Sequence, residues 1–285
     1  MSQLFLASPT LRAVLVAGAI AAPLVSLSRP AAPTAKPRVL TVVASEYSFE
    51  LPASVPAGLT TIRLVNKGKE LHHMVLVRFD EGKSLDDLFA AMKQGADGPP
   101  PSWLHEVPSP NAVGPNGETS VTVALQPGNY AVLCFIPAAD HAPHVAKGMA
   151  KPFKVTPAYG AKTAALPKAD VTMTLVDYDF ALSKPLKAGK HVIRVKNGAS
   201  QPHEVQLVRL DPGKTPADVT AWVDKQEGPP PGLPLGGVVG VAPGTQANWP
   251  VTLEKGEYAL ICFIGDAKDG KPHFAHGMSK QITVN

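Results

Sequence analysis

The sequence has few charged residues, only two cysteines and no cluster of basic residues. Charged residues make up 18% and hydrophobic residues 45% of the 285, which argues against both a disordered chain and a membrane protein with many spans. With a formal net charge of +4 and no Lys/Arg cluster, nucleic acid is not an expected partner. No Ser/His/Asp set, phosphate-binding loop or paired carboxylate motif indicates one of the common enzyme classes.

The N-terminal segment is typical of an export signal. Arg12 precedes an apolar run, Ala13 to Leu27, which Pro23 interrupts and which is too short for a comfortable membrane span. No cysteine follows the run, so lipoprotein processing has no acceptor. We predict a signal peptide at about 1–28 and a Pro-rich leader at 29–37. The protein is then periplasmic or extracellular, with membrane contact at most through this segment; an uncleaved anchor is the alternative.

The two halves of the sequence repeat one another at an offset of 128–131 residues. The clearest matches are 66–79 with 197–210, Gly-Pro-Pro-Pro at 98–101 with 228–231, and 125–136 with 253–264. Chance does not produce matches in this order, so the sequence indicates an internal duplication. We predict one domain at 38–157, a linker at 158–167 and a second domain at 168–285.

Apolar and β-branched runs of strand length dominate each copy. They lie at 39–43, 60–65 and 74–77, and again at 171–175, 191–195 and 205–208. Ser84 and Thr215 are each followed three residues later by Asp, a pattern typical of helix starts, which predicts helices at about 85–94 and 216–225. The predicted fold is all-β: two tandem Greek-key β-sandwich domains, each with one inserted short helix.

One histidine in each copy is predicted to face the core. Side chains alternate across a strand, so His203 shares a face with apolar Val205, whereas Glu204 lies on the opposite face. His72 takes the inward position in the first copy, and His73 replaces Glu204 and is expected to be exposed to solvent. A single inward histidine is typical of a hydrogen-bonded core residue.

A second group of residues favours a metal site over a histidine that is only hydrogen bonded in the core. Each copy holds His, Cys, His and Met in the same order: His72, Cys134, His144 and Met149, then His203, Cys262, His273 and Met278. Two imidazoles and a thiolate with a weak thioether form the blue-copper ligand set. The alternatives for the cysteines, a buried apolar side chain or one disulfide, do not explain the accompanying histidines and methionines. Equivalent positions in two domains also rarely lie within the roughly 7 Å that a disulfide requires.

The second copy resembles plastocyanin and azurin, blue copper proteins of the cupredoxin family. The resemblance lies in the inner-strand segment 197–207, in Gly256-Glu-Tyr258 before the cysteine, and in Pro-His, three residues, Gly-Met at 272–278. It implies that the eight residues given above are copper ligands, with up to two copper ions per chain. Cysteine and the second histidine lie ten and eleven residues apart here, farther than in the family. A hairpin in this insertion either returns the histidine to the cysteine or opens the site.

The resemblance implies a one-electron carrier that exchanges electrons with a redox partner protein. A metal-free binding module and a copper delivery or storage protein are the alternatives. No histidine flanks Cys134 or Cys262, so we expect neither a multicopper oxidase nor a copper nitrite reductase, and no enzyme in general. We also expect the imidazole edges of His144 and His273 to reach the surface as electron ports.

Overall fold

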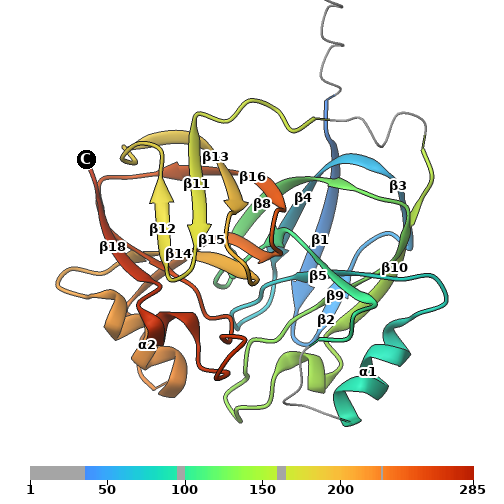
Figure 1. Cartoon of the computed structure of the whole chain (residues 1–285). Coiled ribbons are helices and arrows are strands. Elements are labelled where there is room, and N and C mark those ends of the chain that lie inside the picture. Colours follow the sequence, from blue (N-terminus) through green and yellow to red (C-terminus); the bar gives the residue numbers. More distant parts are fainter. Residues whose placement is uncertain (1–35, 95–99, 159–164, 226) are drawn as a thin grey trace, which may run out of the picture. The chain divides into compact units, whose positions relative to one another are not determined.

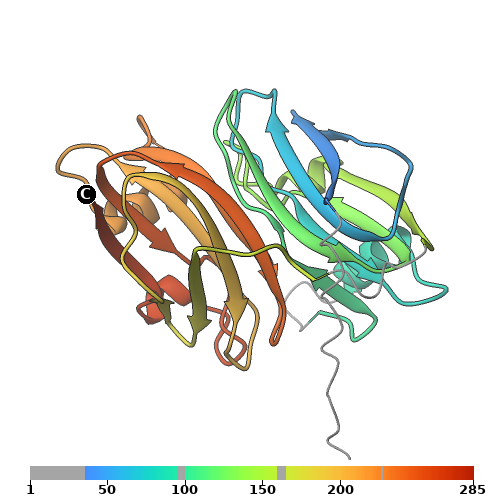
Figure 2. The same cartoon turned by 90° about the horizontal axis from the view of Figure 1, so that it is seen from above.

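The computed structural model describes residues 36–94, 100–158, 165–225 and 227–285 (Figure 1). The predicted signal peptide, leader residues 29–35 and linker residues 159–164 lie outside these ranges. Within them, no helix is long and apolar enough to cross a membrane. The predicted all-β fold is confirmed, with two β-sandwich domains whose layers of strands are visible in Figure 2.

The first domain packs two groups of strands around its core. One group has the order β8 (Glu118–Leu125), β4 (Gly58–Asn66), β1 (Arg38–Ser45) and β2 (Ser48–Glu50). The other has the order β3 (Ser54–Pro56), β10 (Ala150–Thr156), β9 (Gly128–Leu133), β5 (Val75–Phe79) and β6 (Leu104–Val107). Along β1, Leu40, Val42 and Ala44 are buried and the residues between them are exposed or half-buried, as expected for a strand with one face on the core.

The second domain repeats this arrangement. Its first group has the order β12 (Asp179–Leu182), β11 (Val171–Val176), β13 (Gly189–Asn197) and β16 (Gln246–Leu253). The second has the order β18 (Ser279–Val284), β17 (Gly256–Ile261), β14 (His203–Leu210) and β15 (Gly232–Val241). The strand predictions therefore hold in both copies, with small differences at the ends.

The two domains are joined through their sheets. Strand β16 pairs with β8, and β7 (Ser109–Pro110) of the first domain pairs with β15 of the second. Trp249 on β16 is fully buried, and its indole Nε1 donates to Thr119 Oγ1 at 3.3 Å across this junction. Buried residues of both domains consequently belong to one continuous apolar cluster.

This junction corrects one expectation about side-chain exposure. Glu204, on the face of β14 opposite the core, is only 5% exposed, and Gln206 on the same face exchanges hydrogen bonds with the backbone of Ala112 at 3.0 and 3.1 Å. His73, predicted to be solvated, is half-buried. Alternation along a strand tells which residues share a face, but it does not tell that a second domain covers that face.

The two helices lie where they were predicted, at α1 (Leu85–Gln94) and α2 (Pro216–Lys225), outside the sandwiches (Figure 1). Each begins with a reciprocal cap. The hydroxyl of Thr215 donates to Asp218 Oδ2 at 2.6 Å, and the amide of Asp218 donates back to Thr215 Oγ1 at 3.4 Å. Ser84 and Asp87 form the same pair in the first domain.

The cap predicts a modest stability effect. Thr215→Ala removes the acceptor for the first-turn amides of α2, so we expect the free energy of unfolding to fall by about 1 kcal/mol. Urea titration followed by circular dichroism measures the change, with Thr215→Ser as the matched control that keeps a hydroxyl. An unchanged midpoint for the alanine variant would mean that the cap does not stabilise α2.

Candidate metal centres

The structure brings one cysteine and two histidines together in each domain. In the first, Nδ1 of His144 lies 3.2 Å from Nδ1 of His72 and 3.4 Å from Sγ of Cys134. All three side chains are fully buried, and each offers a donor atom within 4.8 Å of the others. The sequence had singled out all three residues.

The second domain has the same arrangement. Nδ1 of His273 lies 3.0 Å from Nδ1 of His203 and 3.3 Å from Sγ of Cys262. Nδ1 of His203 lies 4.0 Å from the same sulfur. These side chains are also fully buried. The two domains therefore hold matching triangles of nitrogen, nitrogen and sulfur.

Neighbouring strands position the first histidine and the cysteine. Cys134 follows β9, which pairs with β5, and His72 lies just before β5. In the second domain Cys262 follows β17, which pairs with β14, and His203 is the first residue of β14. The two ligand types reach one end of each sandwich because antiparallel neighbours carry them there.

A short 3₁₀ turn positions the second histidine and the methionine. Pro143 precedes the turn His144–Lys147, which ends at Gly148 with φ of 98°. This left-handed conformation is easily adopted only by glycine, and it lets the amide of Met149 donate back to the carbonyl of His144 at 3.0 Å. The second domain repeats the geometry over 272–278, where Gly277 has φ of 103°.

The insertions between cysteine and histidine form hairpins that close on the site. In the first, Pro137 and Pro143 form a β-bridge, and the amide of His144 donates to the carbonyl of Ile136 at 2.9 Å. In the second, the amide of His273 donates to Ile264 at 2.8 Å. Of the two outcomes left open by the sequence, the structure shows the hairpin that returns the histidine to the cysteine.

The methionines lie beside these triangles. Met149 and Met278 are fully buried. Met149 accepts a backbone hydrogen bond from Cys134 at 3.2 Å, and Met278 accepts one from Cys262 at 3.1 Å. Backbone contacts thus tie each methionine to the cysteine and histidine of its own domain.

The donor geometry fits a metal ion. In the second domain, an ion equidistant from the corners of the triangle with sides of 3.0, 3.3 and 4.0 Å lies about 2 Å from each donor atom, the length of a metal–imidazole bond. Burial lowers the pKa of His72, His144 and His273, which favours the neutral imidazole that binds metal. Burial also raises the pKa of Cys134 to about 12, so a bound cation is needed to hold this sulfur as thiolate. Both cysteines are free, which excludes the disulfide alternative.

No family model matches the sequence, and no curated protein matches it. Among solved structures, an auracyanin from Roseiflexus castenholzii is 25% identical, matches 43% of this chain and 99% of its own, and has a TM-score of 0.29. Auracyanin A from Chloroflexus aurantiacus, a “blue” copper protein, is 20% identical, with 43% and 100% of the two chains matched and a TM-score of 0.29. A multicopper oxidase is 13% identical over 87% of this chain and 89% of its own, with a TM-score of 0.25.

These superpositions are loose, so the fold is described from the chain's own topology and donor set. Each domain joins a β-sandwich of mixed parallel and antiparallel strand pairs to a buried His–Cys–His triangle and a Pro-His-x₃-Gly-Met turn. Both domains are cupredoxin-like. Each cupredoxin-like site has the soft sulfur and imidazole donors that bind copper.

The comparison also corrects the expectation that the protein is not an enzyme. Structures that match 85–87% of the chain include a laccase from Pediococcus acidilactici and a copper nitrite reductase from Thermus scotoductus. The expectation was argued from the absence of histidines beside Cys134 and Cys262. That local feature does not separate this pair of cupredoxin-like domains from enzymes.

Carboxylates lie against the outer nitrogen of every site histidine, a feature that the sequence analysis missed. In the second domain, His203 Nε2 is hydrogen bonded to Asp177 Oδ1 at 2.9 Å, and His273 Nε2 lies 3.7 Å from Asp266 Oδ2. Asp266 comes from the hairpin insertion and has a side chain only 1% exposed. Hydrogen bonds from Tyr178 at 2.6 Å and Gln201 at 2.9 Å hold the pKa of Asp266 well below its usual range.

In the first domain, carboxylates also lie beside the outer nitrogens of both site histidines, but they belong to different residues. His72 Nε2 lies 3.7 Å from Glu46 Oε1, and His144 Nε2 lies 2.8 Å from Glu70 Oε2, an ion-pair distance without hydrogen-bond alignment. Tyr47 donates to Glu70 at 3.4 Å. A carboxylate at the outer nitrogen favours the tautomer with its proton there and leaves Nδ1 to face the sulfur; of the four contacts, the one at His203 is a hydrogen bond.

An acidic residue and a tyrosine form the two-residue loop of a hairpin over each site. Glu46 and Tyr47 connect β1 to β2, and Asp177 and Tyr178 connect β11 to β12. Both tyrosines have positive φ, 44° and 68°, which bulky residues seldom adopt, and both pack edge-on against the second histidine. The sequence contains a pattern that could have indicated these contacts, because each acid stands 26 residues before the inward histidine of its own domain.

The expectation that His144 and His273 expose their edges is therefore wrong. Both side chains are 0% exposed. The acid–tyrosine loops and the hairpin insertions cover the outer nitrogens that a shorter loop would leave open. His141 and His276, which lie near the two hairpin insertions, are exposed.

The carboxylate contacts predict a change in copper affinity. Asp266→Asn removes the negative charge beside His273, so we expect affinity at the second site to fall about 10- to 100-fold. Competition with a copper chelator measures it, in a background where Cys134→Ser silences the first site. Asp269→Asn is the matched control, because this acid of the same insertion lies 3.1 Å from exposed His276. Equal losses in both variants would contradict a specific role for Asp266.

Proposed function

We propose that the protein binds one copper ion in each domain and passes single electrons through these sites. The ligands are His72, Cys134 and His144, with Met149 as the weak fourth ligand, and His203, Cys262 and His273 with Met278. The observation that carries the proposal is the buried Nδ1–Nδ1–Sγ triangle, present in both domains. Copper, when bound, supplies a Cu(II)/Cu(I) couple.

The residues around the donors favour electron transfer. Sulfur and imidazole donors held on paired strands and a closed turn give a geometry that changes little when the charge of the site changes. All six donor side chains are fully buried, which keeps water away from the site. Complete burial also favours electron transfer over copper delivery, because delivery needs a ligand within reach of a partner protein.

We further propose that the chain is exported to the periplasm or cell exterior and exchanges electrons with a redox partner protein. The apolar run at 13–27 supports export, and the buried thiols suit a compartment where a free cysteine needs protection from oxidation. The expected partner is another electron-transfer protein. Nothing in the sequence favours nucleic acid.

A redox titration of the copper-loaded protein tests the proposal. We expect an intense visible absorption that bleaches on reduction and returns on oxidation, with two electrons taken up per chain. Reversible cycling over many rounds would support electron transfer. A protein that binds copper but shows no reversible change, or that takes up no copper, would contradict it.

A further inference from the structure

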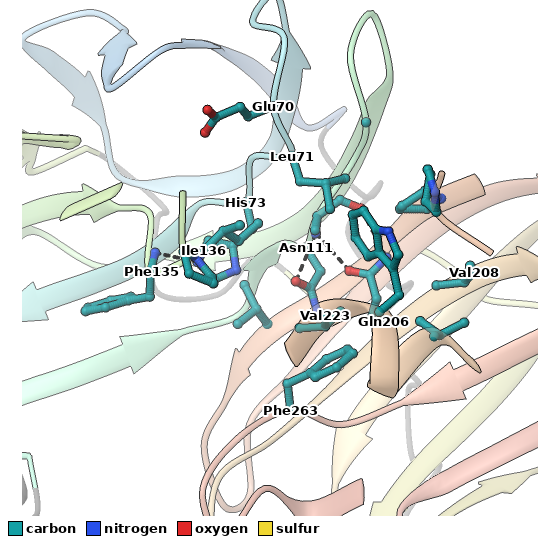
Figure 3. Close-up of a pocket in the computed structure, with 18 of the residues that line it drawn as sticks. Glu70, Leu71, His73, Asn111, Phe135, Ile136, Gln206, Val208, Val223 and Phe263 are labelled. Carbon is teal, nitrogen blue, oxygen red and sulfur yellow. Dashed lines mark hydrogen bonds between the residues drawn. The ribbon is translucent and has the colours of Figure 1, made fainter. Parts of the chain in front are cut away.

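A cavity of about 750 Å³ lies between the two domains (Figure 3). Val75 and Val208 line it from the two sheets, and each belongs to a small apolar cluster outside the main core. Phe135 and Phe263, which directly follow the site cysteines, add aromatic rings to the lining. A cavity of this size and apolar character is typical of a binding site for a small organic molecule.

The Gly-Pro-Pro-Pro segment of the second copy forms one wall of the cavity. Pro230 and Pro231 line it together with Trp222 of α2. The indole Nε1 of Trp222 donates to the carbonyl of Gly228 at 3.0 Å, which holds the segment against the helix. Because the φ angle of proline is fixed, this wall is rigid.

Large apolar side chains are exposed at this cavity. In the part of the chain that the structure describes, four large hydrophobic side chains are exposed. Two of them line the cavity: Phe135, which is 40% exposed, and Leu233, which is 55% exposed. Exposed apolar residues that gather at a hollow are typical of a binding site. The lining therefore fits a molecule that is mostly apolar.

Two carboxyl groups also line this apolar cavity, one from each domain. Glu106 comes from β6 and Glu204 from β14. Both oxygens of Glu204 accept hydrogen bonds, from the amide of Phe263 at 2.9 Å and from Nδ2 of Asn111 at 3.0 Å. Oε2 of Glu106, in contrast, is buried and has no hydrogen-bond partner among the described residues. Glu106 thus has an unused acceptor at the cavity.

The protein supplies no buried cation at this place. Among the described lining residues, the one Lys or Arg is Lys69, which is exposed. Burial raises the pKa of Glu106, because a buried carboxylate without a positive partner is costly. When the Gly-Pro-Pro-Pro segments are aligned, Gly236 takes the place of Glu106 in the second copy, and His73 replaces Glu204 in the first. The duplication therefore explains neither acid.

We propose that the cavity binds an apolar organic cation, a protonated amine with an aromatic or alkyl body. Its ammonium group meets Glu106, and its body packs against Phe135, Trp222 and Phe263. The ammonium supplies both the donor that Oε2 of Glu106 lacks and the positive charge that stabilises a buried carboxylate. The faces of aromatic rings also attract cations, so the rings and the carboxyl group favour the same ligand. This site uses none of the metal ligands and does not depend on the function proposed above.

Three probes of similar shape and different charge test the proposal: phenylbutylammonium, neutral phenylbutanol and anionic phenylbutyrate. Isothermal titration calorimetry measures their affinities for the purified full chain without added metal, so that no amine binds through copper. We expect the ammonium to bind about tenfold more tightly than the alcohol, and the carboxylate not to bind. In NMR spectra, the amide signals of Phe135 and Phe263 should shift with the ammonium, which would place it in the cavity.

Glu106→Gln keeps the size of the side chain and removes its charge. We expect it to weaken ammonium binding about tenfold and to leave alcohol binding unchanged. Leu233→Ala, at an exposed position of the lining, should weaken both probes by the same factor. Glu227→Gln is the matched control and should change neither, because this acid is exposed beside the Pro-rich segment and does not line the cavity.

Equal affinities of the ammonium and the alcohol for the wild type, or unchanged ammonium binding by Glu106→Gln, would overturn the assignment of a cation. Binding of none of the probes, or of the carboxylate alone, would overturn the site. If Glu106→Gln does not fold, the three probes with the wild type and Leu233→Ala still decide between these outcomes. Loss of copper binding or of redox cycling would bear only on the proposed function.

Discussion

Replacement of Cys134 and Cys262 together by serine is expected to abolish the intense thiolate-to-copper absorption and most copper binding. A serine hydroxyl is not a soft ligand, and its oxygen does not give the sulfur-to-copper charge transfer. Each single variant should keep about half of the wild-type absorption and one copper per chain, because the two triangles share no donor atom. Metal analysis and visible absorption of purified protein measure both quantities.

The fold should survive this double substitution, because serine is close to cysteine in size; circular dichroism checks this point. His141→Ala is the control, since this exposed histidine of the first insertion lies within the Cys-to-His segment without reaching the site. It should leave colour and copper content unchanged. Retention of colour and copper by the double serine variant would show that the thiolates are not ligands.

Glu204 is expected to make the metal-free protein less stable as the pH rises from about 4.5 to about 7. Burial raises the pKa of Glu204 to about 7, from 4.5, against the opposing hydrogen bonds of Phe263 and Asn111, and nearby Glu106 adds to the rise. The folded protein therefore binds this proton more tightly than the unfolded chain. The resulting stabilisation is complete below pH 4.5 and is lost as the pH passes the folded value.

The difference between a pKa of 4.5 in the unfolded chain and about 7 in the folded protein corresponds to about 3 kcal/mol. Glu204→Gln keeps the side chain neutral and should remove most of this pH dependence. Urea titrations at several pH values measure it, with Glu50→Gln at an exposed position of β2 as the control for loss of one carboxylate. Parallel pH profiles for wild type and Glu204→Gln would contradict the buried, proton-binding state of this residue.

The sequence was sufficient to predict the elements that depend on local patterns. Apolar periodicity marked the strands, and the Ser84 and Thr215 caps placed both helices at their observed bounds. The ligand triangles were predictable because both copies keep histidine, cysteine and histidine in equivalent places. A duplication supplies two independent instances of one pattern within a single chain.

Features that depend on packing could not be predicted in this way. The burial of Glu204 depends on a second domain that covers the outer face of β14, and strand alternation carries no information about such cover. The burial of His144 depends on the fold of an insertion and on Glu70, which lies far from it in sequence. Asp266 and Glu70 each place a carboxylate beside the outer nitrogen of the second histidine, but they occupy non-equivalent positions in the two copies. Comparison of the two copies therefore does not reveal them.

The ligand environment of bound copper tests the central claim most directly. X-ray absorption at the copper edge, recorded on wild-type protein loaded to saturation, counts the atoms bound to the metal. We predict two copper ions per chain, each with two imidazole nitrogens and one strongly bound sulfur. Copper bound only through nitrogen and oxygen, or a protein that takes up no copper, would contradict the assignment of both sites.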